Sequence, residues 1–477
     1  MNSKMKLYSF AFGEGYPYEI FAPLSVLPYS LFFDSSDHLH ELGRYSFIAF
    51  HPFEIIESKN GKVSVTNKDQ QLAFDALALD TLKERLELYG LDKQNRSDLP
   101  PFQGGAAGFF GYDLVRGLEK IPQQAQDNEN MPDMAIGLYD QVYAYDHHKK
   151  TGWFMVHAQD EQTAKARYAH FIKRTQDQVK SETSAFSGDS YWKSSHTKRQ
   201  YKEAVQRAID YIYAGDIFQC NLSQKFEAEL PQGFSPWDHY LGLRRVNSAP
   251  FAGFMNFGSF MLSSASPERF LFVQNRQVET RPIKGTARRL EEEGVDRIYR
   301  NHLENSKKDR AENTMIVDLM RNDLSKVCED HAIDVPQLCK LESFAKVHHL
   351  VSVVTGTLRA DQSAVDLLRA CFPGGSITGA PKIRAMHIIE ELEKTRRGAY
   401  CGAMGYINFN GTMDTNIIIR TLVYQDNKVS FNVGGGIVAD SVPEDEYDET
   451  MVKAEAIFNS FELLAMENLQ KEMKAEQ

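Results

Sequence analysis

Residues 400–436 read YCGAMGYINFNGTMDTNIIIRTLVYQDNKVSFNVGGG, and this stretch decides the class of fold. Three runs, at 400–409, 415–424 and 429–433, are rich in the β-branched and aromatic residues that favour strands. Asn410-Gly411 and Asp426-Asn427 separate the runs, and such pairs favour the tight turns of β-hairpins. We therefore predict an antiparallel meander that ends at three consecutive glycines.

The chain before the meander alternates predicted strands and helices. We predict a helix that Thr197 caps and Gly215 ends, followed by strands near 217–226, 251–257, 260–264 and 270–273. A helical stretch spans 298–324, Pro381 opens another helix, and a last helix begins near Asp445. The polar, serine-rich segment 181–195 is the predicted linker. We therefore divide the sequence into an amino-terminal region, 1–180, and a second region, 190–465.

Composition excludes several classes of protein. The chain has 477 residues, of which 42% are hydrophobic and 25% charged, as expected of a soluble globular protein. Its formal net charge of −11 argues against broad binding of nucleic acid. No segment approaches the roughly 18 apolar residues of a membrane span, and the amino terminus lacks the apolar core of a secretory signal. The 5 cysteines form no disulfide framework and no metal motif, which favours a reducing cytoplasm.

The stretch Thr280-Arg281-Pro282-Ile283-Lys284-Gly285-Thr286 is a predicted loop that joins a hairpin to the helical stretch. Pro282 fixes its own φ and biases the preceding residue toward extended geometry, so a strand should end there. Gly285 permits a turn or a close approach of backbone that a side chain would block. By itself the stretch fits either a surface lysine beside a turn or a lysine placed for chemistry.

Two pairs of carboxylates have helical spacing. Asp309 and Glu312 are three residues apart in one predicted helix, and Glu446 and Glu449 are three apart in another, so each pair lies on one helix face. If the two faces meet across a cleft, their oxygens suit Mg²⁺ better than Zn²⁺ or Cu²⁺. The alternative is two ordinary solvated acidic faces.

Other charged or bare positions have two readings each. Glu268, between two apolar strands, is either a general acid with a raised pKa or the partner of a cation such as Arg269. Arg420 closes an apolar run and needs an internal acid or a substrate carboxylate. Gly434–Gly436 offer an anion-binding nest or a tight turn.

Two further side chains are open in the same way. Lys453 is either a helix-face partner of Glu449 or a ligand contact, and His349 is a packed ring or a site residue. Neither a G-x-S-x-G elbow nor an H-E-x-x-H pair occurs in the sequence, so hydrolase and zinc functions have little support.

Five motifs resemble the chorismate-utilising enzymes, a family that includes anthranilate, aminodeoxychorismate, isochorismate and salicylate synthases. They are ASPERF at 265–270, DRAENTMIVDLMRND at 309–323, FPGGSITGAPKIRAM at 372–386, YCGAMGYINFNGTMDTNIIIRT at 400–421 and GGGIVADSVPEDEYDETMVK at 434–453. The resemblance is strong over 190–465 and extends to the amino-terminal region through GRYSFIAFHPF and PFQGGAAGFFGYDL. It implies an α+β structure in which two large antiparallel β-sheets pack together with helices outside, and in which the two halves interleave.

The resemblance also implies roles for single residues. Glu312 and Glu449 would be ligands of Mg²⁺, with Asp309 and Glu446 in its outer shell, and the metal would hold the ring carboxylate of chorismate. Glu268 would be the general acid that assists loss of the ring hydroxyl. The positions implied to bind substrate are Gln219, His349, Ser376, Tyr400, Arg420, Gly434, Gly435, Gly436 and Lys453.

Within the family, three positions indicate amination at C4. Isochorismate and salicylate synthases carry at one position a lysine base that activates water. This chain has Gln219 at that position, and glutamine cannot take a proton at neutral pH. Lys284 stands where anthranilate synthases carry alanine and aminodeoxychorismate synthases carry lysine, and Asn313 after Glu312 also resembles the latter. The implied mechanism has Lys284 attack C2 of chorismate before ammonia enters at C4 and expels it, giving 4-amino-4-deoxychorismate for p-aminobenzoate and folate synthesis.

The resemblance implies partners as well. The sequence shows no glutaminase segment, so a separate amidotransferase subunit is expected to supply ammonia. Relatives bind tryptophan in the amino-terminal region, but Phe33-Asp34-Ser35-Ser36 departs from the Leu-Glu-Ser pattern of those that tryptophan inhibits. Two alternatives stay open: an anthranilate synthase component of tryptophan synthesis, and a chorismate-binding regulatory module without turnover.

Overall fold

The predicted meander at 400–433 is divided between two sheets, and this division organises the fold. In the computed structural model, strands β21 (Ala403–Asn408) and β22 (Met413–Ile417) pair in one sheet, whereas β23 (Thr421–Gln425) and β24 (Lys428–Ile437) pair in the other. The prediction of one continuous strand over 415–424 is therefore wrong. The strand breaks because Arg420 has a left-handed φ of 50°, which turns the chain from one sheet into the other.

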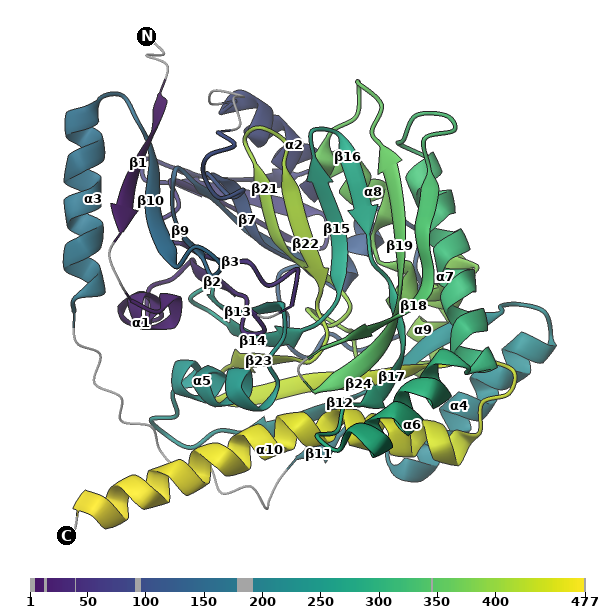
Figure 1. Cartoon of the computed structure of the whole chain (residues 1–477). Helices are drawn as coiled ribbons and strands as arrows, with labels where there is room; N and C mark the ends of the chain where they lie inside the picture. Colours follow the sequence, from purple (N-terminus) through teal and green to yellow (C-terminus); the bar gives the residue numbers. More distant parts are fainter. Residues whose placement is uncertain are drawn as a thin grey trace.

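The structure describes residues 5–12, 15–38, 40–90, 96–177, 192–344 and 346–475, with side chains as far as residue 464. Within these ranges each sheet has 12 strands, and the strands pair antiparallel (Figure 1). The first sheet runs in the order β1 (Lys6–Phe12), β10 (Thr151–Ala158), β9 (Gln141–Asp146), β3 (Tyr45–Ala49), β2 (Ser30–Asp34), β13 (Phe251–Asn256), β14 (Met261–Ser266), β23, β24, β12 (Gln219–Glu229) and β11 (Lys193–Ser194), with β20 (Gly379–Ala380) beside β12.

The second sheet runs in the order β17 (Ile283–Arg288), β19 (Val347–Thr357), β16 (Gln277–Thr280), β15 (Arg269–Gln274), β22, β21, β7 (Gly105–Phe110), β8 (Met134–Tyr139), β4 (Glu54–Lys59), β5 (Lys62–Asn67) and β6 (Gln71–Asp75), with β18 (Asp334–Ser343) beside β19. Strands of both sequence regions are neighbours in each sheet, since β2 pairs with β13 and β7 pairs with β21. The two regions therefore interleave, as the resemblance implies.

Helices cover the outer faces of the sheets (Figure 1). They are α1 (Pro17–Phe21), α2 (Ala78–Leu88), α3 (Glu161–Thr175), α4 (Lys198–Tyr213), α5 (Pro236–Val246), α6 (Glu293–Glu304), α7 (Lys307–Ser325), α8 (Ala364–Cys371), α9 (Lys382–Leu392) and α10 (Pro443–Ala475), with short 3₁₀ turns η1 (Ala22–Leu24), η2 (Tyr112–Gly117) and η3 (Gly375–Ile377). None of the described helices is long and apolar enough to cross a membrane.

The helix predictions are confirmed with one exception. Thr197 caps α4 by accepting from the backbone N–H of Gln200. The predicted helix over 298–324 is instead two helices, because Ser306 accepts from the N–H of Asp309 and starts α7 anew. Residues 181–191 of the predicted linker lie outside the described part of the chain, and Lys193–Ser194 belong to β11.

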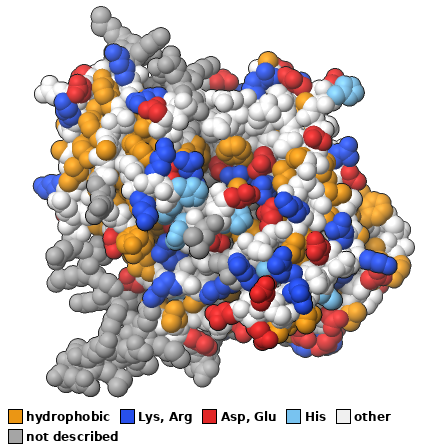
Figure 2. Space-filling model, in the orientation of Figure 1, with side chains coloured by type: hydrophobic (Ala, Val, Ile, Leu, Met, Phe, Trp, Pro, Cys, Tyr) orange, Lys and Arg blue, Asp and Glu red, His pale blue; other side chains and the backbone are white. Residues whose placement is uncertain are grey.

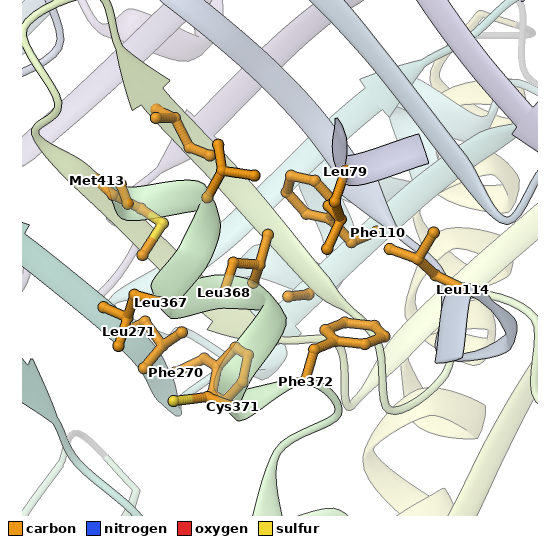
Figure 3. Packing of buried hydrophobic residues seen from close by; sticks show 14 of the residues in the cluster. Leu79, Phe110, Leu114, Phe270, Leu271, Leu367, Leu368, Cys371, Phe372 and Met413 are labelled. Atoms are coloured by element: carbon orange, nitrogen blue, oxygen red, sulfur yellow. The ribbon is translucent and has the colours of Figure 1, made fainter. Parts of the chain in front are cut away.

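The largest apolar cluster joins the two sequence regions. Figure 3 shows Leu367, Leu368 and Cys371 of α8 against Phe270 and Leu271 of β15 and against Met413 of β22. Leu79, Phe110 and Leu114 of the amino-terminal region complete the same cluster. A second cluster fills the space between the sheets, where Phe47 and Met255 of the first sheet belong to the same buried group as Phe109 and Met404 of the second. Burial of this shared core makes the two regions depend on each other for stability.

Candidate active site

Glu268 and Arg420 lie at two adjacent points where the chain passes from one sheet to the other. Glu268 connects β14 of the first sheet to β15 of the second, and Arg420 connects β22 to β23. These crossings are neighbours, because β14 pairs with β23 and the carbonyl of Glu268 accepts from the N–H of Ile417. Glu268 and Arg420 therefore lie close together in the two connections, outside the strands of either sheet.

Glu268 is only 4% exposed and has few stabilising contacts for a negative charge. Ser376 donates its hydroxyl to Glu268 Oε1 at 2.7 Å, and the N–H of Ile283 approaches the same oxygen at 3.5 Å. Burial raises the pKa of Glu268 to about 7, although the bond from Ser376 and the charge of Lys284 act in the opposite direction. A carboxyl group with this pKa can hold a proton near neutral pH and give it up, as a general acid must.

Lys284 is in strand β17, not in a loop as predicted. Pro282 does end the preceding strand, since β16 stops at Thr280 and β17 begins at Ile283. Gly285, with φ of 76°, forms a bulge beside Lys284. A Cβ atom at Gly285 would lie 2.8 Å from Leu303 of α6 and 3.0 Å from Asp309 of α7, so the expected close approach is confirmed.

Lys284 and Gln219 meet at one carboxylate oxygen. Nζ of Lys284 lies 2.6 Å from Glu312 Oε1, and Gln219 donates its amide Nε2–H to the same oxygen at 2.5 Å. The side chains of Lys284 and Glu312 are each 9% exposed, and Gln219 is 1% exposed. A lysine predicted from sequence to be either a surface residue or a placed one is therefore buried against two site residues.

The three glycines continue strand β24 and form neither a nest nor a turn. Gly434, Gly435 and Gly436 pair in register with Ser223, Leu222 and Asn221 of β12. The bare backbone makes room for acids instead. A Cβ atom at Gly436 would overlap Glu312 Oε1 and Gln219 Nε2, and one at Gly435 would lie 3.3 Å from Glu446 Oε2 and 3.5 Å from Glu449 Oε1.

The two predicted acidic helix faces therefore meet over the glycine strand. Glu312 of α7 lies at Gly436, Glu446 and Glu449 of α10 lie at Gly435, and Asp309 lies over the bulge at Gly285. Each of the three glutamates has a lysine partner: Lys284 for Glu312, Lys453 for Glu449 at 2.7 Å, and Lys308 for Glu446 at 3.3 Å. The side chains of Glu312 and Glu446 are 9% and 4% exposed, whereas that of Glu449 is half exposed.

Charges and burial act differently on the two acids of α10. The charge of Lys453 lowers the pKa of Glu449, whereas burial raises the pKa of Glu446. Among the described residues no three His, Cys, Asp or Glu side chains are grouped as a ready cage for a metal ion. The donors still suit Mg²⁺, because this ion uses one or two carboxylates and completes its shell with waters and substrate oxygens.

The imidazole ring of His349 is buried and has one unpaired nitrogen atom. His349 Nδ1 lies 2.9 Å from Thr286 Oγ1 and 3.3 Å from the carbonyl of Gly285, and Nε2 has no hydrogen-bond partner among the described residues. Burial lowers the pKa of His349 to about 3, so the ring is neutral. The ring packs against Phe344, with ring centres 5.0 Å apart, and its unpaired nitrogen is also available to a ligand.

Arg420 has no carboxylate partner within the described part of the chain. Its guanidinium contacts Asn247 Oδ1 at 3.5 Å, and burial lowers its pKa. Tyr400 is 8% exposed and packs under the guanidinium of Arg397, 5.6 Å from the ring centre. The charge of Glu268 opposes the lowering of the Arg420 pKa, so an internal acid acts on Arg420, although the two form no ion pair within the described structure.

The buried pair Glu393 and Arg397 was missed in the sequence, although its i, i+4 spacing was visible. Arg397 donates to Glu393 at 2.7 Å, to the carbonyl of Ile377 at 2.9 Å and to the carbonyl of Asn221 at 2.8 Å. Glu393 also accepts from the N–H and hydroxyl of Ser223, both at 2.8 Å. One ion pair thus fixes the strand that carries Gln219 to the turn that carries Ser376.

A cavity of about 480 Å³ lies apart from these residues, between the two sheets. Aromatic rings line much of it, among them Phe33, Phe47 and Tyr406, and Ser35 and Asn416 add polar groups. Arg269 also lines the cavity and is paired with Asp414 at 2.9 Å. The alternative in which Glu268 pairs with Arg269 is therefore not observed.

Comparisons with known proteins identify the family of this chain. Residues 29–459 match the family model described as chorismate binding enzyme. Aminodeoxychorismate synthase component 1 of Salmonella typhimurium is 42% identical over 443 residues, covering 93% of this chain and 95% of that protein. The protein of the same name from Escherichia coli is 40% identical over 442 residues, with coverage of 93% and 95%. The crystal structure of anthranilate synthase component I from Streptococcus pneumoniae has a TM-score of 0.77 at 33% identity, covering 87% of this chain and 92% of that one.

Proposed function

The chain belongs to the family of chorismate-binding enzymes, and we propose that it aminates chorismate at C4 to give 4-amino-4-deoxychorismate. The observation that carries the proposal is the placement of Lys284, buried at Glu312 and close enough to Glu268 for its charge to act on that carboxyl group. A lysine in this position can act as a nucleophile while the acid gives its proton to a leaving group.

Two unpaired groups support binding of an anionic ring compound. Arg420 has no carboxylate partner in the described structure, so a substrate carboxylate is the partner that we propose. His349 Nε2 is a second unpaired group, and the glycine strand leaves room beside Glu312. Ser376, Tyr400 and Lys453 complete the proposed binding surface.

In the proposed first step the Lys284 ammonium gives one proton to solvent, and the neutral amine then forms a bond to C2 of chorismate. The ring double bond shifts, the C4–O bond breaks, and the hydroxyl leaves as water with the proton of Glu268. In the second step the lone pair of ammonia forms the C4–N bond, the ring electrons shift back, and Lys284 leaves C2 as a neutral amine. The C4 ammonium then returns one proton to Glu268, so the net reaction exchanges a hydroxyl for an amine with release of water.

We also propose that Glu312 and Glu449 hold Mg²⁺, with Asp309 and Glu446 beside them. The carboxylate oxygens at Gly435 and Gly436 support this assignment. A bound Mg²⁺ would neutralise the ring carboxylate of chorismate. Calorimetric titration with MgCl₂ tests the assignment without turnover: Glu312→Gln should weaken binding at least tenfold, and unchanged affinity would remove Glu312 from the ligand set.

The similar bacterial proteins are named component 1, and we propose that a glutaminase subunit acts as the second component. The 5 cysteines are free and buried, which favours the cytoplasm as the place of action.

Product analysis separates this function from its rivals. Chorismate, MgCl₂ and ammonium sulfate are incubated with the protein, and an aminodeoxychorismate lyase is then added. We expect p-aminobenzoate only after the lyase is added. Fluorescent anthranilate formed without lyase would identify the rival synthase, and absence of turnover with a competent glutaminase would favour a regulatory module.

We propose that the cavity between the sheets accepts a ligand of the size and aromatic character of tryptophan. Its volume of about 480 Å³ and its aromatic lining support that class of ligand. Because residues 33–36 depart from the pattern of the inhibited relatives, we expect binding without inhibition. Thermal unfolding with and without tryptophan measures binding, and initial rates at saturating tryptophan measure inhibition.

A further inference from the structure

The side-chain carbonyl of Gln219 is a buried acceptor without a partner. Gln219 is 1% exposed, and Oε1 has no hydrogen-bond partner among the described residues, whereas its Nε2–H is held by Glu312. Because Glu312 Oε1 needs a donor, the amide is fixed with Nε2 toward Glu312 and Oε1 directed elsewhere. Buried carbonyl groups are rarely left unpaired, so the structure provides an acceptor for a ligand that brings N–H or O–H groups.

This acceptor lies next to the nucleophile. The Gln219 amide and the Lys284 amine both bond to Glu312 Oε1, so the two nitrogens are neighbours across a single oxygen atom. Asn221, two residues further on the same face of β12, has a second unpaired carbonyl oxygen and is 7% exposed. Two unpaired amide acceptors therefore lie on one face of β12, and neither can remove a proton at neutral pH.

We propose that Gln219 Oε1 binds the ammonia that enters at C4, an inference that rests on the proposed function. Water needs a general base to become an effective nucleophile, whereas the lone pair of neutral ammonia is nucleophilic without one. A neutral carbonyl that accepts one N–H orients the molecule and leaves the lone pair free. A lysine or carboxylate base in the same place would serve water instead.

In the bond-forming step the lone pair of the bound ammonia makes the C4–N bond while Lys284 departs from C2. The nitrogen then carries three hydrogens and a positive charge, and Gln219 Oε1 keeps its hydrogen bond to one of them. The hydrogen bond from the nitrogen to Gln219 Oε1 thus becomes stronger as positive charge develops on the nitrogen, since hydrogen bonds that involve charged groups are stronger.

The test uses the full chain with ammonium sulfate as the nitrogen source and measures two steps separately. Mass spectrometry follows the Lys284–chorismate adduct without ammonia, and lyase-coupled assays give KM for ammonia. Gln219→Met removes the acceptor but keeps the size of the side chain. We expect its KM for ammonia to rise about tenfold, the factor for one hydrogen bond of roughly 1.4 kcal/mol, with adduct formation within about threefold of wild type.

A matched control variant separates the acceptor from other effects. Gln224→Met is the matched control: Gln224 is equally buried on the same strand, but its Oε1 accepts from Ser194 and its Nε2 donates to Thr450, both at 2.7 Å. We expect Gln224→Met to leave KM for ammonia unchanged.

Three outcomes would overturn the proposal. The first is an unchanged KM for ammonia in Gln219→Met. The second is an equal rise in Gln219→Met and Gln224→Met, which would mean a general disturbance of β12. The third is a loss of adduct formation in Gln219→Met with no change in KM for ammonia, which would mean that the Gln219 amide binds the hydroxyl of chorismate and not ammonia. Failure of the proposed function itself is distinguishable, because wild-type protein would then form no adduct.

Discussion

The hydroxyl of Ser376 controls the proton affinity of the proposed general acid, and its removal has a calculable effect. Ser376 donates to Glu268 Oε1 at 2.7 Å and thereby stabilises the ionised carboxylate. A hydrogen bond to a charged group contributes about 1.5–3 kcal/mol, and 1.36 kcal/mol corresponds to one unit of pKa. Ser376→Ala should therefore raise the pKa of Glu268 from about 7 by roughly 1 to 2 units.

The pH dependence of kcat/KM reveals the change. Glu268 must be protonated to act as an acid, so activity falls as pH rises through its pKa. In Ser376→Ala this basic limb should move from about pH 7 to about pH 8–9, even if the rate at pH 7 is lower. The assay is lyase-coupled formation of p-aminobenzoate between pH 5.5 and 9.5.

Ser430→Ala is the matched control for this experiment. Ser430 also donates its hydroxyl to a glutamate, Glu129, but on a part of β24 that is outside the site. We expect its basic limb to coincide with that of wild type. A limb in Ser376→Ala that stays in place, or moves to lower pH, would refute the assignment of the basic limb to Glu268.

Three other predictions follow from the same geometry. Gly436→Ala should reduce kcat/KM at least about a hundredfold, because a Cβ atom there overlaps Glu312 and Gln219. Gly294→Ala should match wild type, because a Cβ atom at Gly294 has nothing within 4 Å. Equal activities of the two variants would contradict the close approach at Gly436. Glu393→Gln should lower the free energy of unfolding in urea by about 3–5 kcal/mol, because it leaves the buried guanidinium of Arg397 without its counter-ion. A loss below about 1 kcal/mol would show that the pair is not isolated from water. The pKa of Glu268 is raised from its ordinary value of 4.5 to about 7 in the folded protein, so its stabilising contribution is complete below about pH 4.5 and is lost above about pH 7. Glu268→Gln should therefore remove about 3 kcal/mol of pH-dependent change in the free energy of unfolding over that window. An unchanged pH profile would count against the raised pKa.

Local features of the fold were predictable from short stretches of sequence. Asn275 and Arg276 form the predicted turn between β15 and β16 with φ of 51° and 65°, and Thr197 caps α4 as expected. The start of α7 could also have been found, because Ser306 three residues before Asp309 is a capping signal. These features depend on neighbours within one turn of chain.

The division of the 415–424 run between two sheets was not predictable in the same way. Ile417, Ile418 and Ile419 are all apolar, and their pattern fits one long strand. The break depends on pairing with β14 and β15, which themselves separate at Glu268. Pairing partners that lie about 150 residues away leave no periodic signal in the run itself.

The site was predictable in its residue types and only partly in its contacts. The three-residue spacing placed Glu312 and Glu449 on helix faces, and the structure brings both faces to the glycine strand. The bond from Gln219 to Glu312 and the pair of Glu393 with Arg397 depend on how α7 and α9 pack on β12. No spacing along the chain encodes that packing.

On the surface shown in Figure 2, acidic and basic side chains are interspersed. The lysines that approach the site, Lys284, Lys308 and Lys453, are paired with glutamates. Of these three pairs, that of Lys284 with Glu312 is the one in which both side chains are largely buried, each being 9% exposed.

Covalent capture of chorismate by Lys284 is the central claim and can be measured directly. Wild-type protein is incubated with chorismate and MgCl₂ without ammonia, quenched, digested and examined by mass spectrometry. We predict an adduct that has lost water on the peptide with Lys284, its decay when ammonia is added, and neither adduct nor 4-amination in a folded Lys284→Ala variant. Amination by Lys284→Ala at the wild-type rate would contradict the account.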